Sequence, residues 1–129
     1  MLLAWHTEAD ENPVAKAAIS SDGGQTFGSP IKINGKPSLG RVDAALYNGT
    51  AYVSWMEQSG QKQEVANLQL ASFAADDTVK QTKRIATLNS SRKAGFPQME
   101  VVGNELIFAW TDVDSAGTSI KTKQMKLLQ

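Results

Sequence analysis

Three tryptophans divide the chain into similar segments, and this repeat limits the folds that the sequence can adopt. Trp5, Trp55 and Trp110 each close a short apolar run, and they are separated by 50 and 55 positions. A repeat of about 40 to 50 residues is typical of proteins built from stacked structural units, propellers among them. The sequence therefore predicts one supersecondary unit that recurs along the chain.

The stretches before the second and third tryptophans align without a gap. Gly40 and Gly95 each stand fifteen residues before their tryptophan. The dipeptides Asn48-Gly49 and Gly103-Asn104 lie at matching positions between two β-rich runs. Because Gly and Asn adopt positive φ angles at low steric cost, such dipeptides favour two-residue hairpin turns. Each of these units is therefore expected to begin with a β-hairpin.

The remaining strands follow from apolar and β-branched runs. The strand that ends at each tryptophan is almost wholly apolar, as expected for a strand buried on both faces between neighbouring sheets. A third strand is predicted in each unit, and a fourth in the first two. The third strands are expected at Val14–Ser20, Val65–Ser72 and Ile120–Leu127, and the fourth at Phe27–Ile33 and Lys83–Ala86. The units thus have three, four and three strands.

This pattern predicts an all-β fold of four-stranded antiparallel blades, an incomplete β-propeller in a single domain. Residues 1–36 form an incomplete blade, residues 37–89 a complete one and residues 90–129 another incomplete one. A closed propeller typically has four to eight blades, and terminal units otherwise leave open faces and strand edges. We therefore expect either the remaining blades of a larger propeller or self-association through Leu2–Thr7 and Ile120–Leu127.

Charge and composition argue against several classes of partner. Thirteen basic and thirteen acidic residues leave no net field that favours nucleic acid. No apolar run approaches the roughly 20 residues of a membrane-spanning helix. The absence of cysteine excludes disulfides, thiolate metal sites and a cysteine nucleophile. No phosphate-binding glycine loop or nucleophile elbow is present. We predict no nucleic-acid or membrane partner, no cofactor and no metal.

The segment between the third and fourth strands of the first unit reads Ser-Ser-Asp-Gly-Gly-Gln-Thr-Phe. Its aspartate can accept hydrogen bonds from backbone N–H groups of its own turn, and its glycines can take strained dihedral angles. The phenylalanine is expected to fill the apolar interior of the blade. The residues of this motif are Ser20, Asp22, Gly23, Gly24, Thr26 and Phe27. The corresponding turn of the second unit, Ser72–Asp77, lacks the glycines.

The motif and the tryptophan repeat together resemble the Asp-box (BNR) repeats of the sialidase-like β-propeller superfamily. This resemblance implies a structural role for the motif, a parent protein that binds or processes carbohydrate, and an extracellular or periplasmic location. It also implies a ligand face formed by the entries to the first strands and the loops between the second and third strands, which would carry Arg41, Glu57 and Asp112. An arginine beside carboxylates could bind an acidic glycan such as sialic acid. His6 is interpreted as a strand-end residue.

Similar sialidases need three arginines, an aspartate acid/base and a tyrosine nucleophile assisted by a glutamate. Only Arg41 has a matching position, and Tyr47 and Tyr52 are interpreted as strand core residues. We therefore assign no catalytic residue and predict a non-catalytic portion of such a propeller. Two alternatives remain, part of an active exo-sialidase or related glycoside hydrolase, and a scaffold for protein partners.

Overall fold

Ten β-strands in three antiparallel sheets form the described part of the chain. The computed structural model describes residues 1–9, 12–59, 65–74, 80–91 and 95–127, and these contain no helix. The strands are β1 (Leu2–Thr7), β2 (Val14–Ile19), β3 (Ile31–Lys32), β4 (Ser38–Tyr47), β5 (Thr50–Gln58), β6 (Val65–Ala74), β7 (Gln81–Asn89), β8 (Gln98–Val102), β9 (Glu105–Asp114) and β10 (Gly117–Lys126). The predicted all-β class and the division into three, four and three strands are confirmed.

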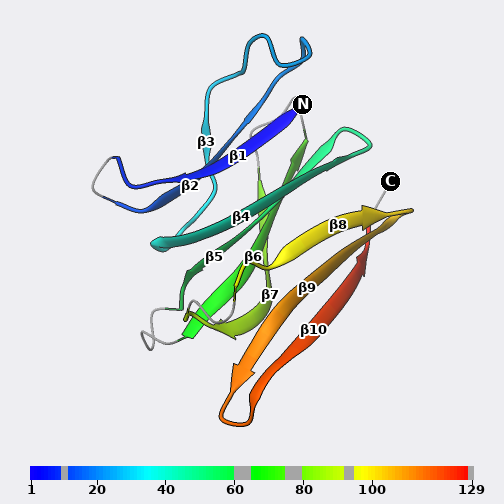
Figure 1. The fold of residues 1–129 in the computed structure, drawn as a ribbon. Coiled ribbons are helices and arrows are strands. Elements are labelled where there is room, and N and C mark those ends of the chain that lie inside the picture. Colours follow the sequence, from blue (N-terminus) through cyan, green and yellow to red (C-terminus); the bar gives the residue numbers. More distant parts are fainter. Residues whose placement is uncertain (10–11, 60–64, 75–79, 92–94, 128–129) are drawn as a thin grey trace.

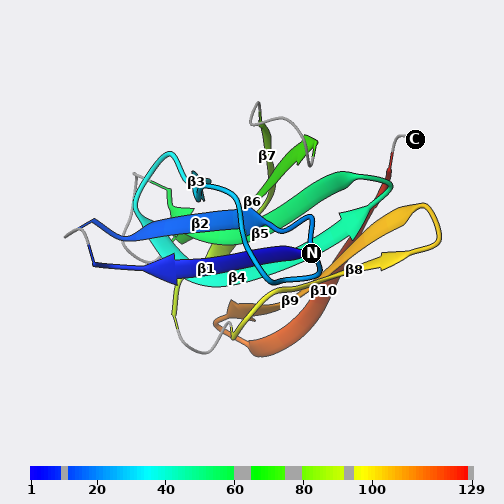
Figure 2. The same ribbon diagram turned by 90° about the horizontal axis from the view of Figure 1, so that it is seen from above.

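The sheets follow one another in chain order. Their strand orders are β1-β2-β3, β4-β5-β6-β7 and β10-β9-β8, so each sheet is a meander. The four-stranded middle sheet lies between the other two (Figures 1 and 2). Each sheet falls within one of the three segments expected from the sequence.

The middle sheet buries both of its faces. On β5, Ala51, Val53 and Trp55 pack toward the first sheet, whereas Tyr52 and Met56 pack toward the third. Successive side chains of a strand point to opposite faces, so a strand between two sheets needs apolar residues at every position. The predicted two-sided burial is confirmed for β5. It is wrong for β1 and β9, which are largely half-buried because the described residues place a neighbouring sheet on one side of each.

Both predicted hairpin turns are present. In the β4–β5 turn, Asn48 has φ 49° and Gly49 has φ 77°, which is the pattern of a type I′ turn. In the β8–β9 turn only Gly103, with φ 61°, has a positive φ, as in a type II′ turn. The two units therefore form equivalent two-residue hairpins with different turn types.

The last strand of the first sheet, predicted as the fourth strand of its unit, is shorter than expected. The sequence predicts a strand over Phe27–Ile33, but β3 covers only Ile31–Lys32. Pro30 has no N–H to donate to the sheet, so regular pairing cannot extend back through it. Phe27 remains 39% exposed, so the prediction that it fills the interior is wrong. In the second unit β7 is longer than predicted, and the second half of the turn Ser72–Asp77 lies outside the described residues.

Candidate ligand-facing end

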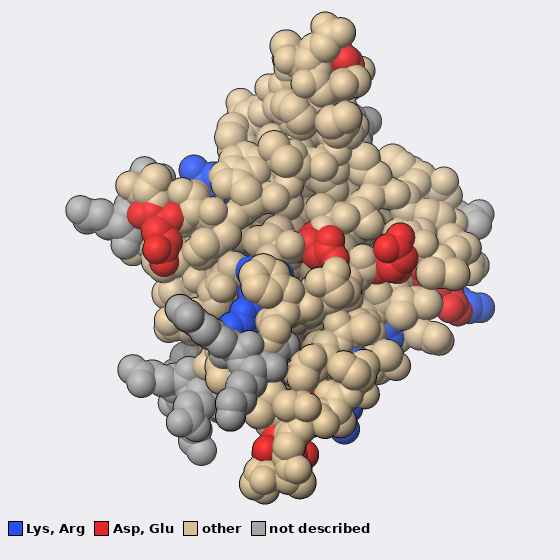
Figure 3. Space-filling view, in the orientation of Figure 1, with Lys and Arg blue, Asp and Glu red and all other residues tan. Residues whose placement is uncertain are grey.

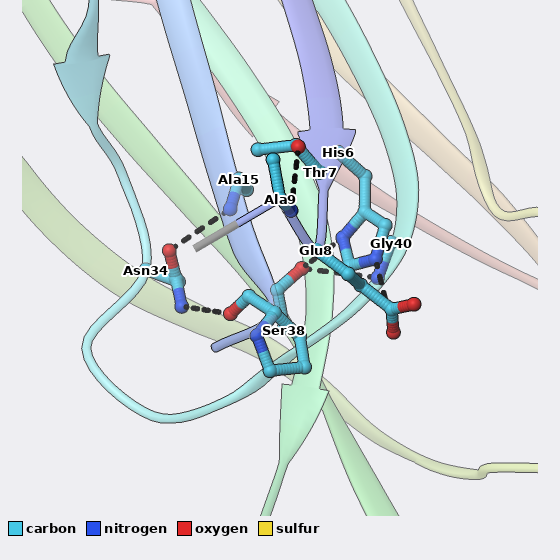
Figure 4. A network of polar contacts seen from close by, with 9 residues as sticks. His6, Thr7, Glu8, Ala9, Ala15, Asn34, Ser38 and Gly40 are labelled. Carbon is cyan, nitrogen blue, oxygen red and sulfur yellow. Dashed lines mark hydrogen bonds and ion pairs between the residues drawn. The ribbon is translucent and has the colours of Figure 1, made fainter. Parts of the chain in front are cut away.

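The start of β4 contains two consecutive residues in the left-handed region. Gly40 has φ 76° and Arg41 has φ 54°, and the pairing of β4 with β5 shifts register on either side of Gly40. The hydroxyl of Ser38 accepts a hydrogen bond from Gly40 N at 3.0 Å and lies 3.1 Å from His6 Nδ1 (Figure 4). A Cβ at Gly40 would lie 3.3 Å from Cγ of the His6 ring. Glycine is therefore favoured here by the dihedral angle, and an added Cβ would also press on the His6 ring.

The Arg41 side chain is held by the residues that follow β7, the last strand of the middle sheet. Its Nη1 donates to Met56 Sδ at 3.4 Å, and its Nη2 donates to the carbonyl oxygens of Ser90 at 3.4 Å and Ser91 at 3.2 Å. Burial lowers the pKa of the guanidinium. A left-handed conformation costs a non-glycine residue about 1–2 kcal/mol, so the surrounding contacts must hold it in place. Guanidinium carries five N–H donors, and these contacts use Nη1 and Nη2, so an added anion that takes two parallel hydrogen bonds would compete with the two carbonyl oxygens for Nη2.

Glu57 is not on an open surface. It is 5% exposed and lies between the first and middle sheets. Its Oε1 accepts from Trp55 Nε1 at 2.9 Å and from Gly35 N at 3.4 Å, and its Oε2 accepts from Gln69 Nε2 at 3.2 Å. The predicted placement of Glu57 at the ligand face is therefore wrong, because the carboxylate is enclosed by the linker that joins the two sheets.

Lys80 approaches the same region from the other side of the linker. Its ammonium group donates to the carbonyl oxygens of Lys32 at 2.9 Å and Ile33 at 2.6 Å. Burial, followed by the charge of Lys32, lowers the pKa of Lys80, and the Glu57 charge acts in the opposite direction. The Glu57 carboxylate thus has a cation within electrostatic range in addition to its three hydrogen-bond donors.

Asp112 occupies the position on β9 that Glu57 occupies on β5, two residues after the tryptophan. It pairs with Ser119 of β10 and is half-buried. Within the described ranges, no hydrogen bond or ion pair joins Arg41, Glu57 and Asp112. The three predicted ligand residues therefore have no direct bond to one another, and their part in binding stays a prediction.

His6 and Asn34 also lie at this end of the molecule. His6 Nε2 lies 4.0 Å from Glu8 Oε1, and His6 stands beside Ser38 and Gly40 (Figure 4). Its interpretation as a strand-end residue is consistent with its place near the end of β1. The buried Asn34 accepts from Ala15 N at 3.0 Å through Oδ1. Its Nδ2 donates to the carbonyl oxygen of Lys36 at 2.7 Å. No local sequence signal marks Asn34, because its partners lie on two different segments.

The Ser-Asp-Gly-Gly-Gln-Thr turn closes on itself at the opposite end of the molecule. Ser20 Oγ donates to Asp22 Oδ1 at 2.7 Å and accepts from Gly24 N at 2.9 Å. Thr26 N donates to Asp22 Oδ1 at 2.9 Å, and Thr26 Oγ1 donates to Asp22 Oδ2. These hydrogen bonds, those of Thr26 above all, hold the pKa of Asp22 far below its usual value. Gly23 and Gly24 have φ of 74° and 93°, as the sequence predicts.

A groove of about 700 Å³ lies beside this turn. It runs between the turn and the β4–β5 hairpin, and its lining includes Met1, Ser20, Leu46, Asn48 and Ala74. Two predicted hairpin connections, one between the first and second strands and one between the third and fourth, therefore share one end of the molecule. This groove lies at the end opposite to Arg41, so the candidate ligand-binding arginine is not part of its lining.

No family model, curated protein or solved structure matches this chain. No group of three or more histidine, aspartate or glutamate side chains in the described ranges could hold a metal ion. A search of the same residues for a helix long and apolar enough to cross a membrane found none. On the face shown in Figure 3, the acidic and basic side chains are scattered among uncharged ones.

Proposed function

We propose that this chain is a non-catalytic portion of a sialidase-like β-propeller whose parent protein binds or processes carbohydrate. The observation that carries the proposal is the repetition of one meander in three stacked sheets, with a tryptophan at the same place in each. The Asp22-centred turn between β2 and β3 adds a second feature of the same kind.

The pairing register supports the repeat in detail. Trp5 pairs with Lys16, Trp55 with Gln69 and Trp110 with Lys121. Trp55 and Trp110 both pack toward the sheet that precedes their own. Trp5 alternates with Leu2 and Ala4, which pack toward the following sheet, so its strand position faces the preceding side as well. Each sheet thus has the same orientation in the stack, as blades of a propeller do.

The roles of the carboxylate and the phenols favour a non-catalytic chain over an enzyme. Glu57 already accepts three hydrogen bonds in a buried site. Tyr52 is 6% exposed, and burial is the main cause that raises its pKa, with the Tyr47 charge second. A raised pKa disfavours the phenolate that nucleophilic attack would need. The candidate groups therefore act in packing and in joining the sheets.

Arg41 is the residue through which we propose that a carbohydrate binds. It lies at the start of an inner strand, and its guanidinium could form two parallel hydrogen bonds with the carboxylate of an acidic sugar. Left-handed backbone at a non-glycine residue is enriched at functional sites, because the strain must be offset by the surroundings. The proposed ligand is an acidic glycan such as one that ends in sialic acid.

The test is the affinity of the chain for a sialylated oligosaccharide, measured by isothermal titration calorimetry. We expect Arg41→Ala to weaken binding by at least about tenfold, because a charge-assisted hydrogen bond is lost. The exposed Arg84 on β7 provides the matched control, and Arg84→Ala should bind as the unchanged chain does. Equal affinity of the Arg41→Ala variant and the unchanged chain would contradict the assignment.

Release of 4-methylumbelliferone from its sialic acid glycoside separates binding from catalysis. We expect no turnover by the unchanged chain. Turnover that disappears in Arg41→Ala but persists in Arg84→Ala would support the alternative, an exo-sialidase, and would contradict the non-catalytic proposal.

A further inference from the structure

We propose that two copies of this chain associate through the outer faces of the stack, the face of the first sheet on one copy against the face of the third sheet on the other. Two such contacts would close a ring of six sheets. This inference rests on the proposed propeller architecture, and it assigns a specific partner, a second copy, to both open faces.

The outer face of the third sheet carries an apolar residue at a position that is buried elsewhere in the stack. The residue before the partner of each tryptophan is Ala15, Leu68 or Ile120. Ala15 and Leu68 are completely buried against the following sheet, whereas Ile120 is 70% exposed. The repeat thus places a residue of the buried type at Ile120, where no described sheet follows.

The outer face of the first sheet shows the complementary pattern. The residue two positions before each tryptophan is Leu3, Val53 or Phe108. Val53 and Phe108 are at most 1% exposed because the preceding sheet covers them, whereas Leu3 is 50% exposed. Each end of the stack therefore presents one half of the contact that already joins the sheets inside the chain.

The charged residues on the two outer faces also differ. Lys16 and Lys32 pair directly and share the face of Trp5, with no acidic residue among the paired positions of that face. The outer face of the third sheet is uncharged over its centre and carries Glu100 and Glu105 near the β8–β9 hairpin, with Lys126 beside them. The paired positions of the first face thus carry two lysines, and those of the third carry two glutamates and one lysine, which favours contact between unlike faces over contact between like faces.

The size of the unit favours closure by two copies. A contact between unlike faces generates a ring if the rotation closes and an open filament if it does not. Propellers typically contain about four to eight sheets. The described residues supply three sheets, so two copies give a ring within that range and three copies would exceed it.

The test is the mass in solution, measured by sedimentation equilibrium over a range of concentrations. We expect the unchanged chain to form a dimer of twice its 13.9 kDa mass. Ile120→Lys and Leu3→Lys should each weaken the dimer by at least about 30-fold, because a charge would enter an apolar contact. Phe96→Lys is the matched control, since Phe96 is 68% exposed but lies in the linker before β8. Far-UV circular dichroism checks that each variant stays folded.

Mixing the two face variants tests whether unlike faces meet. An equimolar mixture of Ile120→Lys and Leu3→Lys should associate more tightly than either variant alone, because one of the two contacts then joins two unaltered faces while the other contact carries both lysines. A mass that stays monomeric up to about 1 mM, an effect of only one face variant, or species that grow beyond the dimer would overturn the proposal. A monomer that still binds the glycan through Arg41 would overturn this inference alone. A dimer that binds no glycan would overturn only the proposed carbohydrate ligand.

Discussion

Glu57 shows how a single buried carboxylate can join two sheets. Replacement by alanine would leave the indole N–H of Trp55, the amide of Gln69 and the N–H of Gly35 without their acceptor. A buried donor without a partner costs about 1–3 kcal/mol. We expect Glu57→Ala to lower the free energy of unfolding by about 2 kcal/mol or more, measured by urea denaturation.

Glu57→Gln is the matched comparison. Its amide oxygen can still accept from the indole, and the Gln69 amide can rotate to present its own oxygen to the new NH₂ group. The loss should therefore be clearly smaller than for alanine. Equal losses in both variants would show that volume, and not the hydrogen bonds of the carboxylate, accounts for the role of Glu57.

The lowered pKa of Asp22 predicts that the folded chain becomes less stable as the pH falls. Its pKa in the folded chain is well below the ordinary value of 3.8, so the folded state favours the carboxylate. The stabilisation is complete above the ordinary pKa and is lost as the pH falls through the folded-state pKa, because the unfolded chain then binds the proton first. Unfolding by urea at several pH values between about 5 and 2 should show a steeper loss for the unchanged chain than for Asp22→Ala. Parallel curves for the two proteins would contradict this role of Asp22.

For single residues, hydrogen bonds within a short segment could be predicted from the sequence, whereas contacts between distant segments could not. The hydrogen bonds of Asp22 stay within seven residues of sequence, so the motif itself indicates them. The surroundings of Glu57 include Gly35, which is brought there only by the packing of two sheets. The left-handed conformation of Arg41 likewise depends on a bulge whose register no residue type in the sequence announces.

The β4–β5 hairpin supplies a prediction about an element. Gly49 has φ 77° with open space around it, so an added methyl group would be strained by dihedral angle alone. Gly49→Ala should lower the free energy of unfolding by about 1–2 kcal/mol, measured by thermal and urea denaturation.

Gly35 is the matched control for that hairpin. It also has open space, and its φ does not lie in the left-handed region. Gly35→Ala should leave the stability unchanged or raise it by up to about 1 kcal/mol, because the unfolded chain loses freedom. A similar loss in both variants would mean that the turn geometry does not limit the residue at Gly49.

The elements themselves were largely predictable because each strand has a local signature. Apolar runs and turn dipeptides indicate nine strands at close to their observed places. The exception is β3, where Pro30 stops regular pairing and leaves Phe27 exposed. This error has a physical cause. Apolar residues extend a strand only where their backbone N–H groups can pair with the neighbouring strand, and Pro30 has no N–H.

For the whole molecule, the sequence indicates stacking but not which residues lie at each contact. Two-sided burial of β5 follows from its continuous apolar run. Leu68 and Ile120 occupy equivalent positions, but Leu68 is buried and Ile120 is exposed. Which of the two occurs depends on whether another sheet follows. The burial of Glu57 could not be predicted for the same reason, because the face of a sheet is defined only once its neighbours are in place.

The anchoring of Arg41 to Ser90 and Ser91 links the first residues of the middle sheet to the linker that leaves it. An anion that recruits the guanidinium would compete with these two carbonyl oxygens, and β8 begins only a few residues farther along. Occupancy at Arg41 and the attachment of the third sheet would then be thermodynamically coupled. Reciprocity requires that a change which tightens or loosens this linker alters the affinity for the anion by the same factor.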